Sequence, residues 1–332
     1  MWFENLTGFK EENPEQVRKN LILQDGYLVS LINGYRYKYG TLEIPTLKEL
    51  KLSAPSIEIF KDSIKVSEVV GNIQQLHQEA NNHGALFQAA SQFNLLEMVG
   101  PDISPERGID IYEKDYTQGP ACAIACGAGT IFRNYFVELD NQIGQTNSYQ
   151  INCLEEIGKA FNNEKLFLWE MKNGYALANK EGLLNIAKQI TELSENEYEE
   201  LKEKLKIGLQ WDTEVTLNKN TQLVNQAYCS ALPIAYLPFE TNLWKDFAKL
   251  ILEATYEATF YAALQNYHKT QNNKLFLTLV GGGAFGNNLN WIFDAIKHSV
   301  DKFKNTPLDV KIVTYGSSNP NVIKFIESIN SK

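Results

Sequence analysis

The sequence predicts an α/β protein in which helices cover both faces of a mixed sheet, a three-layer α/β/α arrangement with an N-terminal extension and a helical and hairpin insert. Two observations predict the layers: short apolar runs alternate with helical patterns, and the chain ends in the order strand, glycine loop, helix, strand, helix. The 332 residues, 44% hydrophobic and 21% charged, are enough for one large domain. We therefore expect a main domain over residues 61–332, an extension over 1–60 packed on it, and an insert at about 140–222.

The first elements are expected in the following order. A short helix over 13–23 precedes a hairpin that turns at Asn33-Gly34, because this dipeptide adopts the positive φ angles of tight hairpin turns. Residues 63–73 form a strand and a turn, and residues 84–94 form a second strand. The segment 95–120 is too long for an ordinary connector, which is typical of a functional or mobile loop. Pro120 then occupies a first helical turn, and small residues continue that helix to about residue 136.

The second half of the chain begins with the insert. It is expected to contain a hairpin that turns at Asn173-Gly174, a charged helix over 180–205 and a strand over 208–217. Residues 225–237 then have the apolar pattern of a buried strand. A long amphipathic helix over 242–269 is indicated by apolar residues near i, i+3, i+4 and i+7. An apolar strand ending at Val280, a helix, a strand over 309–318 and a last helix follow.

The composition argues against several classes of function. A net charge of −9 makes the chain a poor candidate for binding nucleic acid through bulk charge. Cys122 and Cys126 share a helix face and could form half of a metal site, but the four histidines show no ligand spacing. We therefore interpret the cysteines as small buried side chains and expect no metal. With no signal peptide and no stretch of ~20 apolar residues, we expect a cytoplasmic protein without membrane contact. The sequence demands no cofactor and leaves the oligomeric state open.

The segment "LTLVGGGAFGNN", residues 277–288, places a glycine loop between a strand and a helix. Gly281, Gly283 and Gly286 have the spacing of a dinucleotide-binding loop. The next strand ends in "VTYGSS" without an acidic residue for a ribose, which argues against a dehydrogenase, and no Lys-Ser/Thr pair follows for a P-loop. A tight turn without ligand and a backbone cradle for a phosphate remain. We favour the cradle, because three consecutive glycines cost backbone entropy.

Together with earlier segments, this loop resembles the macrodomain, the module that binds ADP-ribose. "IKVSEVVGNI" (64–73) is similar to the family's early strand, "LFQAASQFNLLE" (86–97) to the strand that enters the first ligand loop, and "TQGPACAIACGAGTIFRNYF" (117–136) to the helix after that loop. "NQAYCSALPIAYL" is similar to the next buried strand, the glycine loop to the diphosphate-holding loop, and "DVKIVTYGSS" to the last strand. The resemblance covers about 63–330, so the extension and the insert have no counterpart in a minimal macrodomain.

The resemblance implies a site for ADP-ribose or an ADP-ribosylated protein. In it, Asn72 replaces the Asp that usually contacts the adenine amino group, Tyr315 stacks on the adenine, and Asn94 stands near the distal ribose with Gln92. The alternatives are a capped turn for Asn72, a strand end for Asn94 and core packing for Tyr315. The other residues that the resemblance places at the ligand are Ile73, Gln118, Gly119, Gly281, Gly282, Gly283, Ala284, Phe285, Gly286 and Asn287.

The loop between the second strand and the Pro120 helix indicates chemistry beyond binding, because six acidic residues lie between positions 97 and 115. A carboxylate near the anomeric carbon can activate water and stabilise an oxocarbenium-like transition state, and acids would also bind the guanidinium of an arginine leaving group. In this respect the loop resembles that of effector-type macrodomain hydrolases that remove ADP-ribose from arginine. Asp115, just before the helix start, is the first catalytic candidate, followed by Glu97 and Asp110.

The expected function is therefore that of a macrodomain-type ADP-ribosylhydrolase, which cleaves the glycosidic bond between ADP-ribose and a modified side chain such as arginine. Two alternatives stay open. If the acids only form a solvated loop, the chain is a non-catalytic binder of ADP-ribose or an NAD-derived nucleotide. The glycine loop could also serve an unrelated nucleotide-dependent enzyme.

Overall fold

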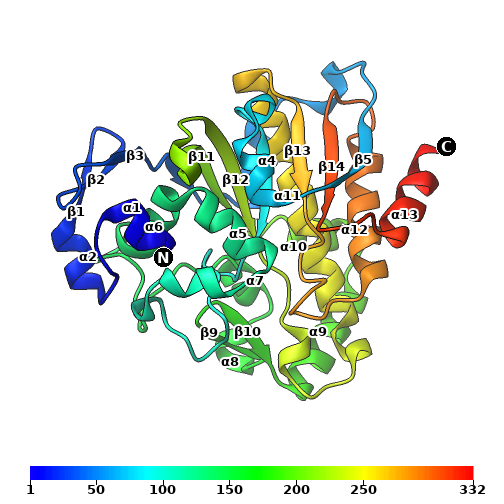
Figure 1. Ribbon diagram of the computed structural model, residues 1–332. Helices are drawn as coiled ribbons and strands as arrows, with labels where there is room; N and C mark the ends of the chain where they lie inside the picture. The colour runs from blue at the N-terminus through cyan, green and yellow to red at the C-terminus, as the bar shows by residue number, and fades with distance from the viewer. Residues whose placement is uncertain (332) are drawn as a thin grey trace.

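The computed structural model describes residues 1–331, and its centre is a seven-stranded mixed sheet (Figure 1). The strand order is β4-β11-β12-β6-β13-β14-β5. The strands are β4 (Thr41–Glu43), β5 (Lys65–Val70), β6 (Leu86–Ala90), β11 (Gly208–Glu214), β12 (Leu223–Cys229), β13 (Lys274–Leu277) and β14 (Asp309–Thr314). Neighbours from β12 to β5 are parallel, and β11 runs antiparallel to both of its neighbours. The predicted α/β class with a mixed sheet is confirmed.

The middle strands are apolar along their length because helices cover both of their faces. Leu86 and Phe87 of β6 and Leu275 of β13 are fully buried, and Leu275 is the register partner of both Leu86 and Val310. Such continuous apolar runs are typical of parallel strands. The strands expected over 84–94, 225–237 and 309–318 are present, but each ends before its pattern does, because the chain turns there into loops at one edge of the sheet.

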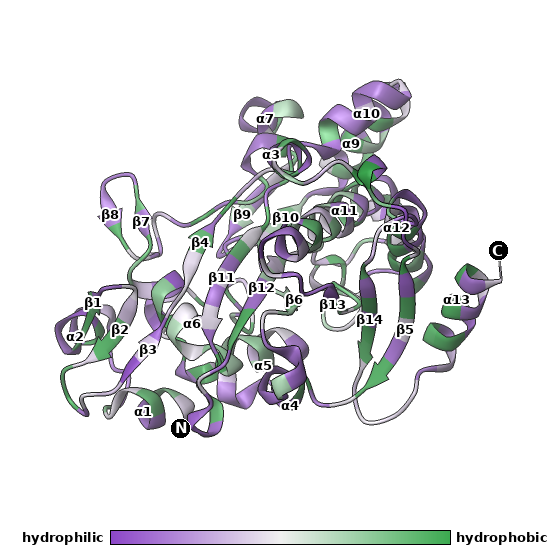
Figure 2. Ribbon diagram, turned by 90° about the horizontal axis from the view of Figure 1, so that it is seen from above, coloured by the Kyte–Doolittle hydropathy of each residue, from purple (hydrophilic) through white to green (hydrophobic). Residues whose placement is uncertain are grey.

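Helices form a layer on each face of the sheet (Figure 2). One layer contains α4 (Ile73–Gln78), α5 (Gln118–Ala125) and α6 (Gly127–Tyr135), and the other contains α3 (Leu47–Ser53), α11 (Lys245–Thr270) and α12 (Leu289–Lys302). At one edge, α13 (Pro320–Asn330) packs beside β5. The predicted long helix is α11, which is buried on most sides because the sheet, α3 and α12 surround it.

The single helix expected over 120–136 is broken at Cys126, whose φ and ψ of −117° and 58° are not helical. Thr216 satisfies the backbone groups that the break frees. Its N–H donates to the carbonyl of Ala125 (2.8 Å), and its hydroxyl accepts from the N–H of Gly127 (3.1 Å). A Cβ at Gly127 would lie 2.9 Å from side chains of the N-terminal helix. Gly127 thus leaves the room in which the N-terminal helix packs closely on this layer.

The N-terminal extension contains α1 (Trp2–Thr7), α2 (Pro14–Asn20) and an antiparallel sheet of β1 (Leu21–Gln24), β2 (Tyr27–Ser30) and β3 (Arg36–Lys38). The predicted hairpin at Asn33-Gly34 joins β2 to β3, and Gly34 has the positive φ (73°) expected there. Residues 41–53, which the sequence assigned to the extension, instead form the sheet edge β4 and the helix α3 on α11. Part of that segment therefore belongs to the core layers.

The insert adds β7 (Glu138–Leu139), β8 (Gln142–Ile143), α7 (Glu155–Ala160), α8 (Asn163–Leu166), β9 (Trp169–Lys172), β10 (Tyr175–Ala178), α9 (Lys180–Glu192) and α10 (Glu195–Lys202). The β9-β10 hairpin turns at Asn173-Gly174, as predicted. The helix expected over 180–205 is divided because Ser194 and Glu197 form a capping box that starts α10. The last strand of the predicted insert, β11, is an internal strand of the central sheet, since β4 pairs with its outer edge.

Short 3-10 helices connect these elements: η1 (Ile57–Ile59), η2 (Ala80–Asn82), η3 (Pro105–Arg107), η4 (Asp110–Lys114), η5 (Leu217–Lys219), η6 (Ile234–Tyr236) and η7 (Thr241–Trp244). All four cysteines are buried free thiols, as predicted. Within residues 1–331, no group of three or more histidine, cysteine or acidic side chains is arranged to hold a metal ion. In the same range, no helix combines the length and apolar character needed to span a bilayer.

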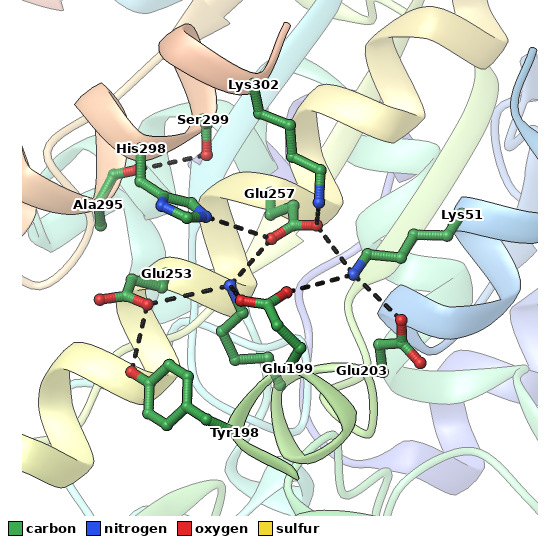
Figure 3. Close-up of polar contacts among 11 residues, drawn as sticks. Lys51, Tyr198, Glu199, Glu203, Glu253, Glu257, Ala295, His298, Ser299 and Lys302 are labelled. Carbon is green, nitrogen blue, oxygen red and sulfur yellow. Dashed lines mark hydrogen bonds and ion pairs between the residues drawn. The ribbon is translucent and has the colours of Figure 1, made fainter. Parts of the chain in front are cut away.

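A buried ion cluster joins four helices through one carboxylate (Figure 3). Glu257 of α11 is fully buried and contacts the ammonium groups of Lys51, Lys202 and Lys302 at 3.0, 3.1 and 2.5 Å. These lysines belong to α3, α10 and α12. Burial alone would raise the pKa of Glu257, but the lysine charges outweigh it and lower the pKa to about 2. The cluster therefore fixes one helical layer through charge as well as packing.

Candidate functional site

The carboxyl ends of β5, β6, β13 and β14 meet at one edge of the sheet, and two neighbouring cavities open there. The inner cavity, about 260 Å³, lies over β6 and β13, and the outer cavity, about 1120 Å³, lies over β5 and β14. Both are lined by Asp115, Thr117, Gln118, Thr278 and Leu279, so they form one continuous cleft. The glycine loop and the acid-rich loop, far apart in the sequence, thus face the same cleft.

The glycine loop after β13 presents free backbone N–H groups to the inner cavity. Gly281, Gly283, Ala284 and Phe285 line this cavity, and their N–H groups make no hydrogen bond within residues 1–331. The 14-residue helix α12 begins directly after the loop, with Asn288 as its side-chain cap. Unpartnered N–H groups at the positive end of a helix suit an anion such as a phosphate.

Two positions of this loop require glycine. Gly281 and Gly286 have φ angles of 76° and 73°, in the left-handed region. A Cβ at Gly281 would lie 2.5 Å from that of Ala231, and a Cβ at Gly286 would lie 2.9 Å from that of Ala235. At Gly283, by contrast, a Cβ would meet no atom of the described chain within 4 Å. The loop is therefore tightly packed on its protein side and open on the other.

Three predicted diphosphate contacts, Gly282, Gly286 and Asn287, lie beside the inner cavity and do not line it. Their backbone N–H groups all bond to carbonyls in or next to the loop. Asn287 is buried, and its amide donates to the carbonyls of Leu232 (2.8 Å) and Gly281 (3.3 Å). These residues therefore hold the shape of the loop through their N–H groups, and they do not offer these groups to the cavity.

Among the acids of the loop, Glu97 is the one buried in the wall of the inner cavity. It is 2% exposed, and neither carboxyl oxygen has a hydrogen-bond partner in the described part of the chain. Burial raises the pKa of Glu97 to about 8, although the charge of Arg133 opposes this. Its N–H donates to the hydroxyl of Tyr112 (2.9 Å), and Gly119, which also lines the cavity, leaves room for its side chain. Glu97 therefore holds a proton at neutral pH and can donate it into the cavity.

Asp115 lies where the two cavities join, since it lines both. Its carboxylate accepts from the N–H of Thr117 (2.9 Å), an interaction that turns the chain into α5. Burial is the largest influence on the pKa of Glu97. The charge of Arg133 and the hydroxyl of Tyr112 lower this pKa, and the charge of Asp115, the smallest of the four influences, raises it. The two acids are therefore electrostatically coupled across one cavity, an arrangement suited to acid–base work.

Asp110 and Asn94 do not reach the two cavities. The Asp110 carboxylate pairs with Arg107 (3.1 Å) on the outer side of the loop. Asn94 is fully buried behind the loop, where its amide donates to Gln150 of the insert (2.8 Å). The structure therefore places neither Asp110, the predicted catalytic acid, nor Asn94, the predicted ribose contact, at the cleft. Both side chains are held by partners that only the folded chain brings to them.

Gln92 and Gln118 line the inner cavity, but their amides are occupied by the protein. Gln118 accepts from the N–H of Ala90 and donates to the carbonyl of Gln88, both in β6. Gln92 both donates to and accepts from the backbone of Met98. The two glutamines thus stabilise the cavity walls, because their amide groups already bond to the backbone.

Asn72, Ile73 and Tyr315 line the outer cavity. The Asn72 oxygen accepts from the N–H of Gln74 (2.8 Å), so this residue caps α4. This agrees with the capped turn that was the alternative for Asn72. Tyr315 is 81% exposed, which excludes core packing for its ring. An exposed aromatic ring together with an aliphatic side chain provides a surface on which a planar base can stack.

The inner cavity has an aromatic wall that the sequence did not reveal. Tyr175 from the β9-β10 hairpin, Tyr236 from η6 and Phe285 from the glycine loop lie with ring centroids 5.1 to 5.6 Å apart. The Tyr175 hydroxyl donates to the carbonyl of Met98 (2.7 Å), which ties the insert to the acid-rich loop. Phe285 belongs to the predicted glycine loop, but no local pattern marks Tyr175 and Tyr236, because distant segments supply them. The insert is therefore part of the site.

Comparisons with known proteins give fold-level likeness only. No protein-family model matches the sequence, and no curated protein matches it. Among solved structures, the chain is similar to poly(ADP-ribose) glycohydrolase from Deinococcus radiodurans in complex with ADP-ribose, at 10% identity over 87% of this chain and 94% of that chain, with a TM-score of 0.45. It is also similar to the poly(ADP-ribose) glycohydrolase of Thermomonospora curvata bound to the inhibitor ADP-HPD, at 10% identity over 96% and 97%, with a TM-score of 0.44. Values this low do not assign the chain to a family.

Proposed function

We propose that this chain binds ADP-ribose and hydrolyses the glycosidic bond that joins it to a modified protein side chain, with arginine as the first candidate. One observation carries the proposal: two complementary features meet at the inner cavity. Unpartnered backbone N–H groups precede α12, and the buried carboxyl group of Glu97 has no partner of its own. The first feature suits a diphosphate, and the second suits an atom that must receive a proton.

In the proposed complex, the diphosphate lies on the unpartnered N–H groups of Gly281, Gly283, Ala284 and Phe285 and is favoured by the positive end of α12. The adenosine occupies the larger outer cavity, where Ile73 and Tyr315 offer a stacking surface. The distal ribose enters the smaller inner cavity, towards Glu97 and Asp115. The tyrosines of the aromatic wall then reduce the access of water to the anomeric carbon, which strengthens charge interactions there.

Hydrolysis proceeds through an oxocarbenium-like transition state at the anomeric carbon. As the bond to the leaving side chain breaks, Glu97 donates its proton to the departing nitrogen or oxygen atom. The oxygen of a water molecule forms the new bond to the anomeric carbon, and Asp115 accepts a proton from that water. The charge of Asp115 also stabilises the positive charge of the transition state. Solvent then removes the proton from Asp115 and returns one to Glu97.

The test uses three substrates: a protein ADP-ribosylated on arginine, a protein ADP-ribosylated on serine, and poly(ADP-ribose). Free ADP-ribose is measured by mass spectrometry after incubation with the purified chain. Release from the arginine-linked protein supports the full proposal, whereas release from only the other substrates would correct the leaving group. Calorimetry with ADP-ribose, NAD and ATP forms the second arm. No binding of ADP-ribose at millimolar concentration would overturn the proposal, and tight binding without release would leave a non-catalytic binder.

A further inference from the structure

The N-terminal segment, residues 2–11, is hydrogen-bonded to the loop that carries the candidate acids. The backbone N–H of Trp2 donates to the Glu113 carboxylate (3.0 Å), and the Trp2 indole N–H donates to the carbonyl of Ile109 (3.2 Å). The Glu11 carboxylate accepts from the N–H of Asp110 (2.6 Å). These contacts join residues about a hundred positions apart in the sequence, so the segment holds this loop in a way that no local turn could.

Glu11 sits in a recess that fits its carboxylate. One oxygen accepts from Asp110 and the other accepts from the hydroxyl of Tyr135 in α6 (2.5 Å). Gly108, with φ of 94°, borders the recess, and a Cβ there would lie 2.6 Å from the Glu11 carboxylate. Removing this carboxylate would leave a partly buried N–H and the hydroxyl of Tyr135 without partners, and the cost of such unpaired groups exceeds the net contribution of the hydrogen bonds.

The contacts of this segment lead directly to both candidate acids. Asp115 follows the held residues 109–113 and lines both cavities. Tyr112, within the same stretch, has the hydroxyl that accepts from the N–H of Glu97. In addition, Trp2 itself lines the outer cavity. A change in how the segment sits would therefore move the backbone that sets the positions of Glu97 and Asp115.

We infer that Glu11 is a positioning residue: through its contact with Asp110 and Tyr135, it holds the stretch 108–115 so that Asp115 and Glu97 face the inner cavity. The inference rests on the proposed function for the role of those two acids. It assigns the N-terminal segment a part in the site, although Glu11 itself touches neither cavity.

The test compares Glu11→Ala with Glu11→Gln, using Glu12→Ala, an exposed neighbour, as the matched control. Amide hydrogen exchange of residues 108–116 is measured without ligand, and kcat, KM and the Kd for ADP-ribose are measured on the full chain. For Glu11→Ala we expect exchange in 108–116 to rise about tenfold, kcat to fall about tenfold and the Kd to change less than about threefold, because a geometry change at the acids affects the transition state more than the bound nucleotide. The Gln variant restores most of kcat, since its oxygen can still accept from Asp110.

Native exchange and native kcat in Glu11→Ala would overturn the inference. The exchange arm needs no substrate, so it decides the matter even if the wild-type chain releases no ADP-ribose, an outcome that would count against the proposed function alone. If Glu11→Ala does not fold, Tyr135→Phe removes the hydroxyl that donates to the Glu11 carboxylate and leaves the backbone of 108–115 unaltered in sequence. Faster exchange at 109–113 in that variant supports the inference, and unchanged exchange there overturns it.

Discussion

Glu97 and Glu11 are two glutamates whose pKa values are raised by burial, and their surroundings separate their roles. Both oxygens of Glu97 lack partners and the residue lines a cavity, whereas both oxygens of Glu11 accept hydrogen bonds from the protein. A buried polar group without a partner costs free energy, so its presence at a cavity points to use by a ligand. A carboxylate whose two oxygens both accept hydrogen bonds from the protein instead indicates a role in holding the structure. The same residue type is thus assigned chemistry in one place and positioning in the other.

Substitution of Glu97 tests the chemical role. Glu97→Gln is expected to bind ADP-ribose within about threefold of the wild type and to lower kcat at least about a hundredfold, because an amide cannot donate the required proton. In the wild type, kcat should fall as the pH rises through about 8, since the protonated form exists below the pKa of Glu97. Single-turnover release of ADP-ribose across this pH range measures both effects. Glu106→Gln, an exposed acid of the same loop, is the control, and an equal loss there would contradict the assignment.

Because Glu11 is largely buried, we also predict how the free energy of unfolding changes with pH. Burial raises its pKa from 4.5 to about 7, despite the hydrogen bonds from Tyr135 and Asp110 and with a small added effect from the charge of Asp110. Between pH 4.5 and about 7, Glu11 is therefore protonated in the folded state and ionised in the unfolded state. This proton stabilises the folded state fully below pH 4.5, and its contribution is lost as the pH rises through about 7. Relative to Glu11→Gln, the wild type should lose on the order of 3 kcal/mol over this range. Urea unfolding of both proteins at several pH values measures the difference, and parallel curves would show the expectation to be wrong.

At the scale of elements, the glycine loop combines a tightly packed side with an open one. Gly281→Ala must place a Cβ against Ala231 at a positive φ, so it should destabilise the chain by about 1–3 kcal/mol and weaken ADP-ribose binding at least about tenfold. Gly283→Ala is the control for stability, because its Cβ would meet no described atom. Thermal unfolding and calorimetry provide the measurements. Wild-type melting and affinity in Gly281→Ala would mean that the loop does not hold the ligand.

Elements with strong local signals were predictable from the sequence. The turns at Asn33-Gly34 and Asn173-Gly174 and the long helix α11 agree with expectation, because turn chemistry and a 26-residue apolar pattern act within one segment. The break at Cys126 was not predictable, since Thr216, from beyond β11, supplies the hydrogen bonds that make it possible. Likewise, the sequence placed β11 in the insert, because only the folded structure shows that β4 pairs with it.

At the scale of the whole molecule, stability and function depend on different parts. Glu257→Ala would remove the carboxylate shared by Lys51, Lys202 and Lys302, although Lys202 keeps its contact with Glu199 (2.7 Å). We expect this change to lower the free energy of unfolding by about 3–5 kcal/mol. The control Lys249→Ala removes a half-exposed pair with Asp294 and should cost less than about 1 kcal/mol. Because none of these residues lines the cleft, the folded Glu257→Ala protein should keep its ADP-ribose affinity. Chemical unfolding and calorimetry test both parts, and equal destabilisation by the two variants would contradict the role of the cluster.

The sequence by itself determined the layered α/β class, the order of the elements and the place of the glycine loop between a strand and a helix, because each of these depends on a pattern within a few tens of residues. The sequence also marked the acid-rich loop, residues 95–120, as a candidate functional segment. Only the tertiary structure decided which of its acids face the cleft: Glu97 and Asp115 do, whereas Asp110 pairs with Arg107 on the outside. It alone revealed Tyr175, Tyr236 and Glu11. The physical reason is that burial, pKa and partnership of a side chain depend on segments that are distant in the sequence and meet only when the chain folds.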